Sequence, residues 1–379
     1  MMTTTELLDT LILYEAPHLS HRDVARIVLQ AGSATAVFST ARAVLRTWGL
    51  KDDTIRHIEA HVESDDIKSQ MDFIEKHSIM TIGYKDDEYP RLLRMCEDAP
   101  LMLYGRGEMD FTRDVPVISI VGTRGITPYG AAAVEDIVAA LSQYKPMIIS
   151  GLAAGVDVHA HRAALKHNLH TVGVLGQGLG TPLFPSENRE TAKDMCYTAG
   201  CGVITEYNHL MAPLPGLFPA RNRIVAGMSI ATIVIEAKAK GGALITARLA
   251  SGYNREVFAL PGRMNDPCSA GCNTLIRENK AIIIDSPQTI IDELSLSMEQ
   301  AVKRREENNQ TILFSELDAE EQKVVNVLRP HEKLHIDELS VELGVAPFEV
   351  AGVLLGMELK GYVESLPGKY YALTPSMRA

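Results

Sequence analysis

Hydrophobic residues follow different patterns in different parts of the chain, and the changes divide it into segments. From about residue 3 to residue 76, apolar residues recur at helical spacing in short stretches such as ELLDTLILYEA and SHRDVARIVLQAG. Ser20 is expected to cap the start of the second stretch, and Gly32 its end. Residues 1–80 are therefore predicted to form a small helical domain of the SAM or helix-hairpin-helix type. No glycine-bearing hairpin loop joins its helices, which favours a packing or partner role over contact with nucleic acid.

The pattern changes after a transitional stretch at residues 81–110. Short apolar runs rich in β-forming residues now recur, separated by segments compatible with helices. Because the runs are continuous rather than alternating, they predict strands buried on both faces, which is typical of parallel sheets. We predict that residues 81–297 form a doubly wound, mostly parallel, Rossmann-like α/β core with strands at 115–122, 147–151, 171–176, 202–207, 231–237, 256–260 and 281–285.

The C-terminal part begins with a charged, polar stretch, which predicts a linker at residues 298–316. Three helix-compatible segments follow, and then two β-rich arms around Pro367 and Gly368. This order is that of a winged-helix domain, predicted here for residues 317–379. The third helical segment offers Glu349 and Glu358 but only Lys360 as a basic residue. It therefore suits contacts with protein better than contacts with DNA phosphates.

Composition and charge narrow the class of protein. No apolar run approaches the roughly 18 residues of a membrane span, and the N-terminus lacks the basic region of a secretion signal. The five cysteines form no CxxC pair, so we expect a cytoplasmic protein with reduced thiols and without a metal site, a cofactor or a membrane partner. The chain has a formal net charge of −11, yet residues 111–295 hold 16 Lys and Arg against 15 Asp and Glu. The acidic excess lies in the flanks, and the core can host a positive site.

Glycine-rich turns follow three of the predicted strands, at Gly122–Arg124, Ser150–Asp157 and Gly176–Gly180. Ligands of open α/β sheets bind beyond the carboxyl ends of the strands, where such turns expose backbone N–H groups that suit phosphate oxygens. A dinucleotide fingerprint would need glycine in place of Thr181, and no P-loop sequence for a nucleoside triphosphate occurs. The turns favour phosphate groups of another kind.

Basic residues collect at the same predicted edge of the sheet: Arg124, Arg221, Arg223 and Lys240, with Arg248 in the next helix. The planar fork of arginine donates two parallel hydrogen bonds to a phosphate. Taken singly, each could be a solvated charge or the partner of Asp157, Glu206 or Glu236. Taken together beside three glycine-rich turns, they favour a site for several phosphates.

Catalytic interpretations find less support in the same segments. Ser150 lies outside a nucleophile elbow, and His159 and His161 would point roughly 200° apart on a helix, too far to share a metal ion. We expect Asp157 to cap a helix and His161 to be packed or hydrogen-bonded. Glu206 and Glu236, at strand ends, could act as a general acid and base, but a role in orienting the arginines is favoured.

Taken in order, these motifs resemble the DNA processing protein A (DprA/Smf) family. YPRLLR (89–94) corresponds to the entry segment of that family. The stretches that carry the resemblance span about 180 residues of the core: VGTR (121–124), SGLAAGVDVHAH (150–161), FPSEN (184–188), TEY (205–207), FPARNRIVAGMS (218–229), EAKAKGGALITA (236–247), VFALPG (257–262) and GCNTLI (271–276).

The resemblance implies a non-enzymatic protein that binds single-stranded DNA, forms a homodimer through its core and loads the recombinase RecA during natural transformation. Arg221 and Arg223, in a loop that opens a helix, would then face successive phosphates. Many relatives place a basic residue where this chain has Ser186, which implies a weaker DNA contact there unless Arg189 replaces it. The residues expected to bind DNA are Gly122, Thr123, Arg124, Ser150, Gly151, Gly155, Arg221, Asn222, Arg223, Lys240 and Gly242.

Two other functions stay open at this point. Nucleotide phosphoribohydrolases also place glycine-rich turns, arginine and glutamate near a phosphate, but KGGALITA (240–247) lacks the glutamate of their PGGxGTxxE signature. A sequence-specific regulator would bind DNA through the winged helix, and deleting residues 311–379 would then abolish binding. The single-strand binder predicts instead that most of the binding survives this deletion.

Overall fold

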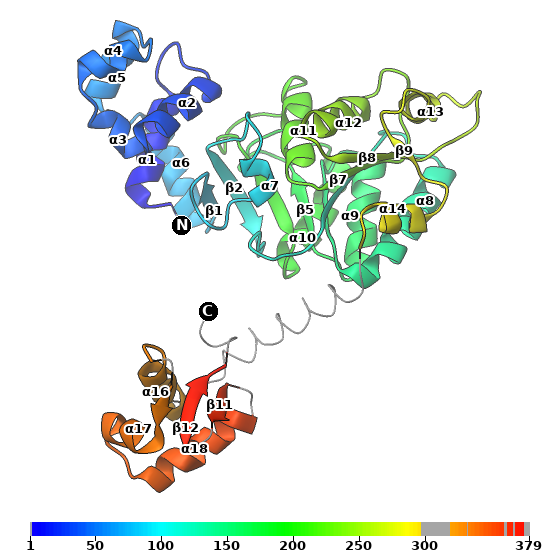
Figure 1. The fold of residues 1–379 in the computed structure, drawn as a ribbon. Coiled ribbons are helices and arrows are strands. Elements are labelled where there is room, and N and C mark those ends of the chain that lie inside the picture. Colours follow the sequence, from blue (N-terminus) through cyan, green and yellow to red (C-terminus); the bar gives the residue numbers. More distant parts are fainter. Residues whose placement is uncertain (1, 297–318, 332, 360–361, 367, 375–379) are drawn as a thin grey trace. The chain divides into compact units, whose positions relative to one another are not determined.

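The computed structural model describes residues 2–296, 319–331, 333–359, 362–366 and 368–374 (Figure 1). Contacts divide the chain into two compact units, Met1–Ala301 and Val302–Ala379. The predicted linker at 298–316 lies outside the described residues. The predicted domain boundaries at residues 80 and 297 stay predictions. In the described part of the chain, no helix combines the length and the apolar character that a bilayer span requires.

The N-terminal segment is helical, as its spacing predicts. Ser20 accepts a hydrogen bond from the backbone of Asp23, whose side chain accepts one from the backbone of Ser20, so the two form a capping box. Gly32 ends the same helix with φ of 97°, a left-handed conformation that glycine adopts without strain. Both predicted caps are therefore confirmed. The helices are α1 (Thr4–Tyr14), α2 (His21–Ala31), α3 (Ala34–Phe38), α4 (Arg42–Thr47), α5 (Asp52–Ala60) and α6 (Asp65–Lys76).

One nine-stranded sheet forms the centre of the first unit, in the order β1-β2-β6-β5-β4-β3-β7-β8-β9. All seven predicted strands are present, and they pair in parallel from β6 to β9. The prediction of a doubly wound, mostly parallel sheet is confirmed. The strands are β1 (Met80–Gly83), β2 (Met102–Gly107), β3 (Val117–Val121), β4 (Met147–Ser150), β5 (Thr171–Val174), β6 (Gly202–Thr205), β7 (Ala231–Val234), β8 (Glu256–Ala259) and β9 (Ile282–Ile283).

Two strands, β1 and β2, come from the stretch that the sequence marked only as transitional. β2 pairs antiparallel with β6, and β1 pairs antiparallel with β2. Both extend the sheet beyond β6, toward the N-terminal helices (Figure 1). The sheet therefore connects the N-terminal segment to the core.

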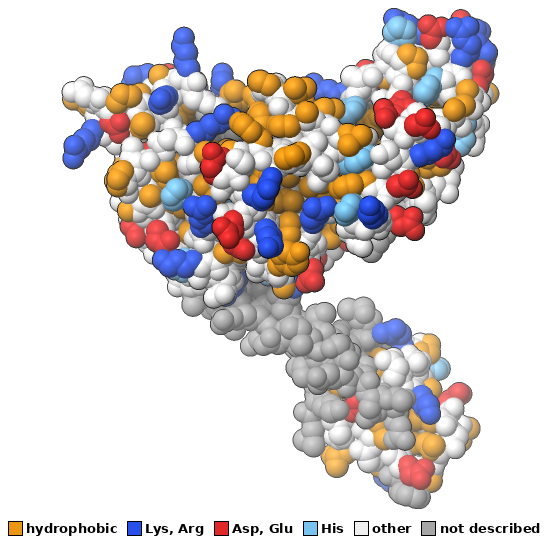
Figure 2. Space-filling view, turned by 180° about the vertical axis from the view of Figure 1, so that it is seen from behind, with side chains coloured by type: hydrophobic (Ala, Val, Ile, Leu, Met, Phe, Trp, Pro, Cys, Tyr) orange, Lys and Arg blue, Asp and Glu red, His pale blue; other side chains and the backbone are white. Residues whose placement is uncertain are grey.

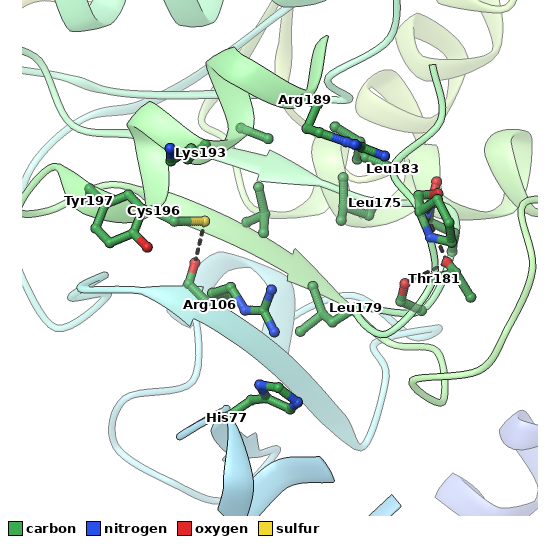
Figure 3. A pocket seen from close by; sticks show the side chains of 15 residues that line it. His77, Arg106, Leu175, Leu179, Thr181, Leu183, Arg189, Lys193, Cys196 and Tyr197 are labelled. Carbon is green, nitrogen blue, oxygen red and sulfur yellow. Dashed lines mark hydrogen bonds between the residues drawn. The ribbon is translucent and has the colours of Figure 1, made fainter. Parts of the chain in front are cut away.

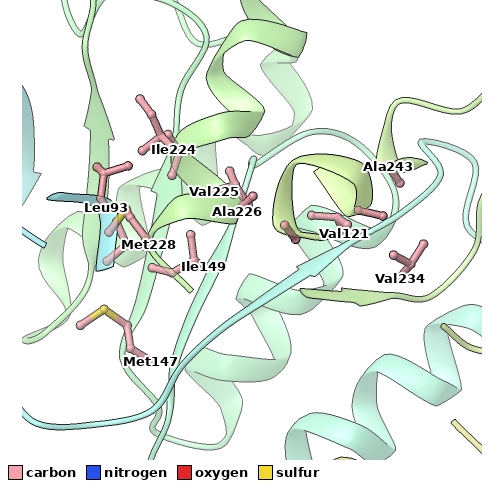
Figure 4. Close-up of a cluster of buried hydrophobic side chains, with 14 of the residues drawn as sticks. Leu93, Val121, Met147, Ile149, Ile224, Val225, Ala226, Met228, Val234 and Ala243 are labelled. Atoms are coloured by element: carbon pink, nitrogen blue, oxygen red, sulfur yellow. The ribbon is translucent and has the colours of Figure 1, made fainter. Parts of the chain in front are cut away.

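Helices cover both faces of this sheet, and each face has its own apolar cluster. One cluster joins α8, α9 and α14 to Ile118, Ile148 and Phe258. The other packs Ile224 and Val225 against strand residues such as Ile149 and Val234, all at most 1% exposed (Figure 4). The helices of this region are α7 (Arg91–Arg94), α8 (Pro128–Leu141), α9 (Val156–Lys166), α10 (Arg189–Tyr197), α11 (Leu217–Gly227), α12 (Ala243–Gly252), α13 (Ala270–Arg277) and α14 (Pro287–Glu293), with short 3₁₀ helices η1 (Ser142–Tyr144) and η2 (Ser186–Asn188).

The C-terminal unit has the winged-helix order that the sequence predicts, so that prediction is confirmed. Its helices share a core that includes Leu328, Leu339 and Leu354, each fully buried. Its three strands pair antiparallel in the order β10-β12-β11. The elements are α16 (Ala319–Leu328), β10 (Leu334–His335), α17 (Ile336–Leu343), α18 (Pro347–Leu359), β11 (Val363–Leu366) and β12 (Tyr370–Leu373).

Candidate nucleic-acid interface

A pocket of about 480 Å³ opens at the carboxyl ends of β3, β4 and β7, and we call it the carboxyl-edge pocket. The turn after β3, the turn after β4, helix α11 and the segment after β7 all contribute to its wall. Of the residues expected to bind DNA, it brings together Gly122, Thr123, Arg124, Gly151, Arg221, Asn222, Lys240 and Gly242. Ser150, Gly155 and Arg223 do not line it.

Three exposed basic side chains stand around this pocket: Arg124, Lys238 and Lys240. The guanidinium of Arg124 lies 5.7 Å from the ring centre of Phe218, within the range of a cation–π contact. Lys238 was not singled out from the sequence. Its spacing from Lys240, in KAK immediately before two glycines, is the signal that could have identified it.

Arg221 does not face solvent, and the expectation that it binds a phosphate directly is wrong for this arrangement. Its side chain is 3% exposed, and its Nη1 donates hydrogen bonds to the carbonyl of Gly151, at 2.5 Å, and to that of Val174. Burial lowers the pKa of Arg221 to about 10, and the Asp157 carboxylate nearby opposes that shift. Arg221 therefore stays charged at neutral pH and joins the ends of β4 and β5 beneath the pocket.

Arg223 points to a different part of the molecule, so the expectation that it continues a row of phosphate ligands is also wrong. It pairs with Glu206, which is 8% exposed, in a separate cavity of about 450 Å³ that Tyr14 and His21 also line. Desolvation raises the pKa of Glu206, and the guanidinium of Arg223 counteracts it. The expected role of Glu206 in orienting an arginine matches this contact.

The divergence of Arg221 and Arg223 has a simple geometric cause. The sequence placed both in a loop before a helix, whereas α11 already begins at Leu217. Pro219 is compatible with the first turn of a helix, because the N–H it lacks has no partner there. Residues two positions apart on a helix are rotated by roughly 200° about its axis. The side chains of Arg221 and Arg223 therefore project from opposite sides of α11.

The turn after β4 is held by internal hydrogen bonds rather than left open. The Ser150 hydroxyl donates to the carbonyl of Ile120 at 2.6 Å, inside the core. Gly155 has φ of 79°, and a Cβ there would lie 2.2 Å from the carbonyl oxygen of Thr123, so only glycine lets the two turns touch. Asp157 lies within α9 and accepts from the backbone N–H groups of Gly151 and Ala153. Ser150 and Gly155 therefore shape the turn without lining the pocket. Asp157 does line the pocket, and its expected role as a helix cap is wrong, because the N-cap of α9 is Gly155 and Asp157 holds the turn instead.

The third glycine-rich turn also differs from its expected role. The N–H of Gly178 donates to the carbonyl of Met211, and that of Gly180 donates to the carbonyl of His209. Backbone oxygens therefore occupy these two donors in place of phosphate.

The two remaining orienting residues have structural partners. Glu236 accepts hydrogen bonds from the backbone N–H and the hydroxyl of Thr127 at the start of α8, so its expected role in orienting an arginine is wrong. His161 is fully buried, with Nδ1 2.7 Å from the hydroxyl oxygen of Thr171, as expected of a packed, hydrogen-bonded histidine. Burial lowers the pKa of His161 to about 3. Among the described residues, no group of three His, Cys, Asp or Glu side chains is placed to hold a metal ion.

Charge on the surface is mixed rather than uniform. On the face seen in Figure 2, basic and acidic side chains are intermixed, and apolar side chains form patches among them. A chain with net charge −11 is not attracted to polyanions as a whole. Binding of a polyanion therefore depends on local groups such as those of the carboxyl-edge pocket.

Comparison with known proteins agrees with this architecture. The family model of DNA recombination-mediator protein A matches residues 80–295, and that of the DprA winged helix domain matches residues 314–369. The chain is 31% identical to Protein Smf of Escherichia coli (strain K12) over 314 residues, which cover 81% of each chain. It is 38% identical to Protein Smf of Synechocystis over 224 residues, which cover 58% of this chain and only 56% of that relative.

Two solved structures resemble the chain at 30% identity each. DNA processing protein A from Streptococcus pneumoniae aligns with a TM-score of 0.65 over 77% of this chain and 99% of its own. DNA processing protein A from Helicobacter pylori, a structure described for its mode of binding single-stranded DNA, aligns with a TM-score of 0.51 over 57% of this chain and 95% of its own. With its core and its winged helix both matched, the chain belongs to the DNA recombination-mediator protein A family.

Proposed function

We propose that this protein binds single-stranded DNA at the carboxyl-edge pocket and loads RecA onto that DNA in transformation or recombination. The observation that carries the proposal is the set of exposed cations, Arg124, Lys238 and Lys240, around one pocket at the carboxyl edge of the sheet. Family membership supports it, as does the described mode of DNA binding of the Helicobacter pylori relative. The RecA partner and the homodimer rest on the family resemblance.

Electrostatics favour an anion in this pocket. Asp157 is the one carboxylate among the described residues that line it, and that carboxylate is engaged by backbone N–H groups. The buried charge of Arg221 lies beneath the opening, where water screens it less than it screens a surface charge. Arg221 thus contributes a fixed positive potential beneath the bound phosphates, and the exposed cations Arg124, Lys238 and Lys240 make the direct contacts.

Aromatic side chains beside the pocket favour a single strand over a duplex. Phe218 lines the pocket, and its ring centre lies 5.7 Å from that of Phe184, whose side chain is 50% exposed. Unpaired bases stack on such rings, whereas the bases of a duplex are stacked on one another and unavailable. An exposed ring next to clustered cations is the combination that single-strand binders use.

The engagement of the two strand-end glutamates argues for binding rather than hydrolysis. Glu236 is held by Thr127, and Glu206 is paired with Arg223 in a different cavity. Neither side chain lines the carboxyl-edge pocket. A nucleotide hydrolase on this sheet would need an acid or base within hydrogen-bond reach of its substrate.

The test is binding of labelled oligo-dT and of the matching duplex to the full chain at two salt concentrations. We expect a preference for the single strand and an affinity that falls steeply with salt. Arg124→Ala should weaken binding, whereas Lys166→Ala, at a lysine paired with Glu135 away from the pocket, should not. Equal affinity for duplex, loss of binding on deleting residues 311–379, or release of free base from nucleoside monophosphates would refute the proposal. Formation of RecA filaments on the same DNA, with and without the protein, tests the loading step.

A further inference from the structure

A second and larger pocket, of about 660 Å³, lies between α10 and β2, and we call it the α10 pocket. Its basic lining side chains are Arg106, Arg189, Lys193 and His77, and apolar side chains such as Leu175 and Leu179 form the rest of its wall. No Asp or Glu is among the described residues that line it. Three Arg or Lys side chains and one histidine thus share this cavity, in a protein with net charge −11.

Spacing along α10 places three of the lining residues on one face of that helix. Arg189, Lys193 and Tyr197 are four residues apart, so their side chains project in nearly the same direction. Figure 3 shows Arg189 and Lys193 on the α10 side of the pocket, with Arg106 and His77 on the opposite side. Tyr197 is 83% exposed, which leaves its ring available to a ligand. Cations therefore approach the cavity from both sides.

Arg106 comes from β2, the strand that the sequence did not reveal. Its guanidinium lies 6.0 Å from the ring centre of Phe73, and the Phe73 ring is itself 4.7 Å from that of His77. Its backbone carbonyl accepts a hydrogen bond from the Cys196 thiol at 3.4 Å (Figure 3). These contacts hold Arg106 at the wall of the cavity without neutralising its charge.

We propose that the α10 pocket is a second nucleotide-binding site, in which Arg106, Arg189 and Lys193 hold the phosphate and Tyr197 contacts the base. Its volume lies within the roughly 300–1,000 Å³ of ordinary small-ligand sites. Arginine and lysine supply the charge-assisted hydrogen bonds that phosphate oxygens prefer. The apolar wall suits a ligand with an uncharged ring, which inorganic phosphate lacks.

Two sources could supply such a nucleotide: a free mononucleotide, or a nucleotide further along the strand bound at the carboxyl-edge pocket. The second source rests on the proposed function, and one loop lies between the two pockets. Leu183 lines the α10 pocket, and the next residue, Phe184, contacts Phe218 of the carboxyl-edge pocket. A strand that crosses this loop would pass from one pocket to the other over an exposed ring.

Two free thiols make the test direct, because each lies in one pocket. Cys196 lines the α10 pocket and Cys268 the carboxyl-edge pocket, both partly exposed, whereas Cys96, Cys201 and Cys272 are buried. Alkylation rates of Cys196 and Cys268 in the full chain would be measured by mass spectrometry, alone, with thymidine monophosphate and with oligo-dT. Protection of Cys196 by the mononucleotide supports a free ligand, and protection by oligo-dT alone supports a continuous strand. If neither slows alkylation of Cys196, the site does not exist.

A matched pair of variants separates this proposal from the proposed function. Lys193→Gln should weaken the binding that protects Cys196 by up to about fivefold, the scale of one exposed charge pair. Lys76→Gln, at an exposed lysine next to His77 that does not line the pocket, should leave it unchanged. Protection of Cys268 by oligo-dT, with Cys196 protected by neither ligand, would overturn the second site and leave the first intact. Protection of Cys196 by the mononucleotide, with no binding of oligo-dT, would refute the proposed function alone.

Discussion

Replacing Arg221 with methionine should destabilise the core without changing how the affinity for DNA depends on salt. The side chain donates to the carbonyl groups of Gly151 and Val174 from a position that is 3% exposed. Methionine keeps the length of the side chain but donates no hydrogen bond. Both carbonyl oxygens then lose a donor, and the buried carboxylate of Asp157 loses a neighbouring positive charge.

The size of this effect follows from the burial. An acceptor left without its donor in the interior costs about 1–3 kcal/mol, and removal of one member of a buried charge pair costs about 3–5 kcal/mol. The buried guanidinium also carries a desolvation penalty, which is what lowers the pKa of Arg221 to about 10. Because methionine is uncharged, the variant is free of this penalty, and part of the cost is offset. We therefore expect the free energy of unfolding to fall by about 3 kcal/mol, at the lower end of the buried-pair range.

Urea denaturation of the wild type and of Arg221→Met measures this difference, with Arg248→Met as the control. Arg248 is an exposed arginine of α12, and its replacement should change the free energy of unfolding by no more than about 0.5 kcal/mol. Where both variants are folded, the slope of log affinity for oligo-dT against log salt should equal that of the wild type for Arg221→Met. For Arg124→Met the slope should fall in magnitude by about 0.7, the value for one phosphate of a single strand. Normal stability of Arg221→Met combined with a reduced slope would mean that Arg221 reaches a phosphate, and our assignment would be wrong.

Three further predictions concern buried residues of the α/β core. Gly155→Ala should destabilise the protein and weaken DNA binding, because its Cβ would lie 2.2 Å from the Thr123 carbonyl oxygen; unaltered affinity would contradict this. Glu236→Ala should cost about 1–3 kcal/mol in urea denaturation, because the backbone N–H of Thr127 loses its acceptor. His161 has a folded pKa of about 3 against an ordinary 6.5, so the unfolded state binds the extra proton between these values and stability falls as the pH falls below 6.5. His161→Gln should remove about 1.4 kcal/mol per pH unit from this dependence, measured as urea midpoints across the window, and an unchanged dependence would refute the assignment.

The sequence was sufficient for the parallel sheet and the winged helix because each strand and helix there carries its own local signal. The strands are continuous apolar runs, and helix ends such as Ser20 and Gly32 have the residue types that their caps require. β1 and β2 gave no such signal. β2 is the short segment MLYGRG, and it becomes a strand through its pairing with β6, about a hundred residues further along the chain.

The sequence predicted the edge of the sheet where the groups of the candidate site meet, but not the directions of their side chains, and DNA binding there stays a prediction. Two of the three glycine-rich turns, and the basic residues Arg124, Arg221 and Lys240, do meet at one pocket. The directions of Arg221 and Arg223 could not be obtained from a motif, because an error of a few residues in the start of α11 changes whether they are neighbours or opposites. Charge alone also failed to distinguish a buried arginine from an exposed lysine such as Lys238, since burial depends on packing against segments distant in the sequence.

The opposed directions of Arg221 and Arg223 also determine how the α/β core would respond to removal of the N-terminal helices. Within one turn of α11, Arg221 bonds to the strand ends. Arg223 pairs with Glu206 in the cavity that Tyr14 and His21 also line. Truncation of the N-terminal helices would hydrate the Arg223–Glu206 pair and loosen the helix that also anchors the turns of the carboxyl-edge pocket. The helical segment and the α/β core are thus expected to unfold in one cooperative transition. The core expressed alone would have a lower free energy of unfolding than its own internal contacts suggest.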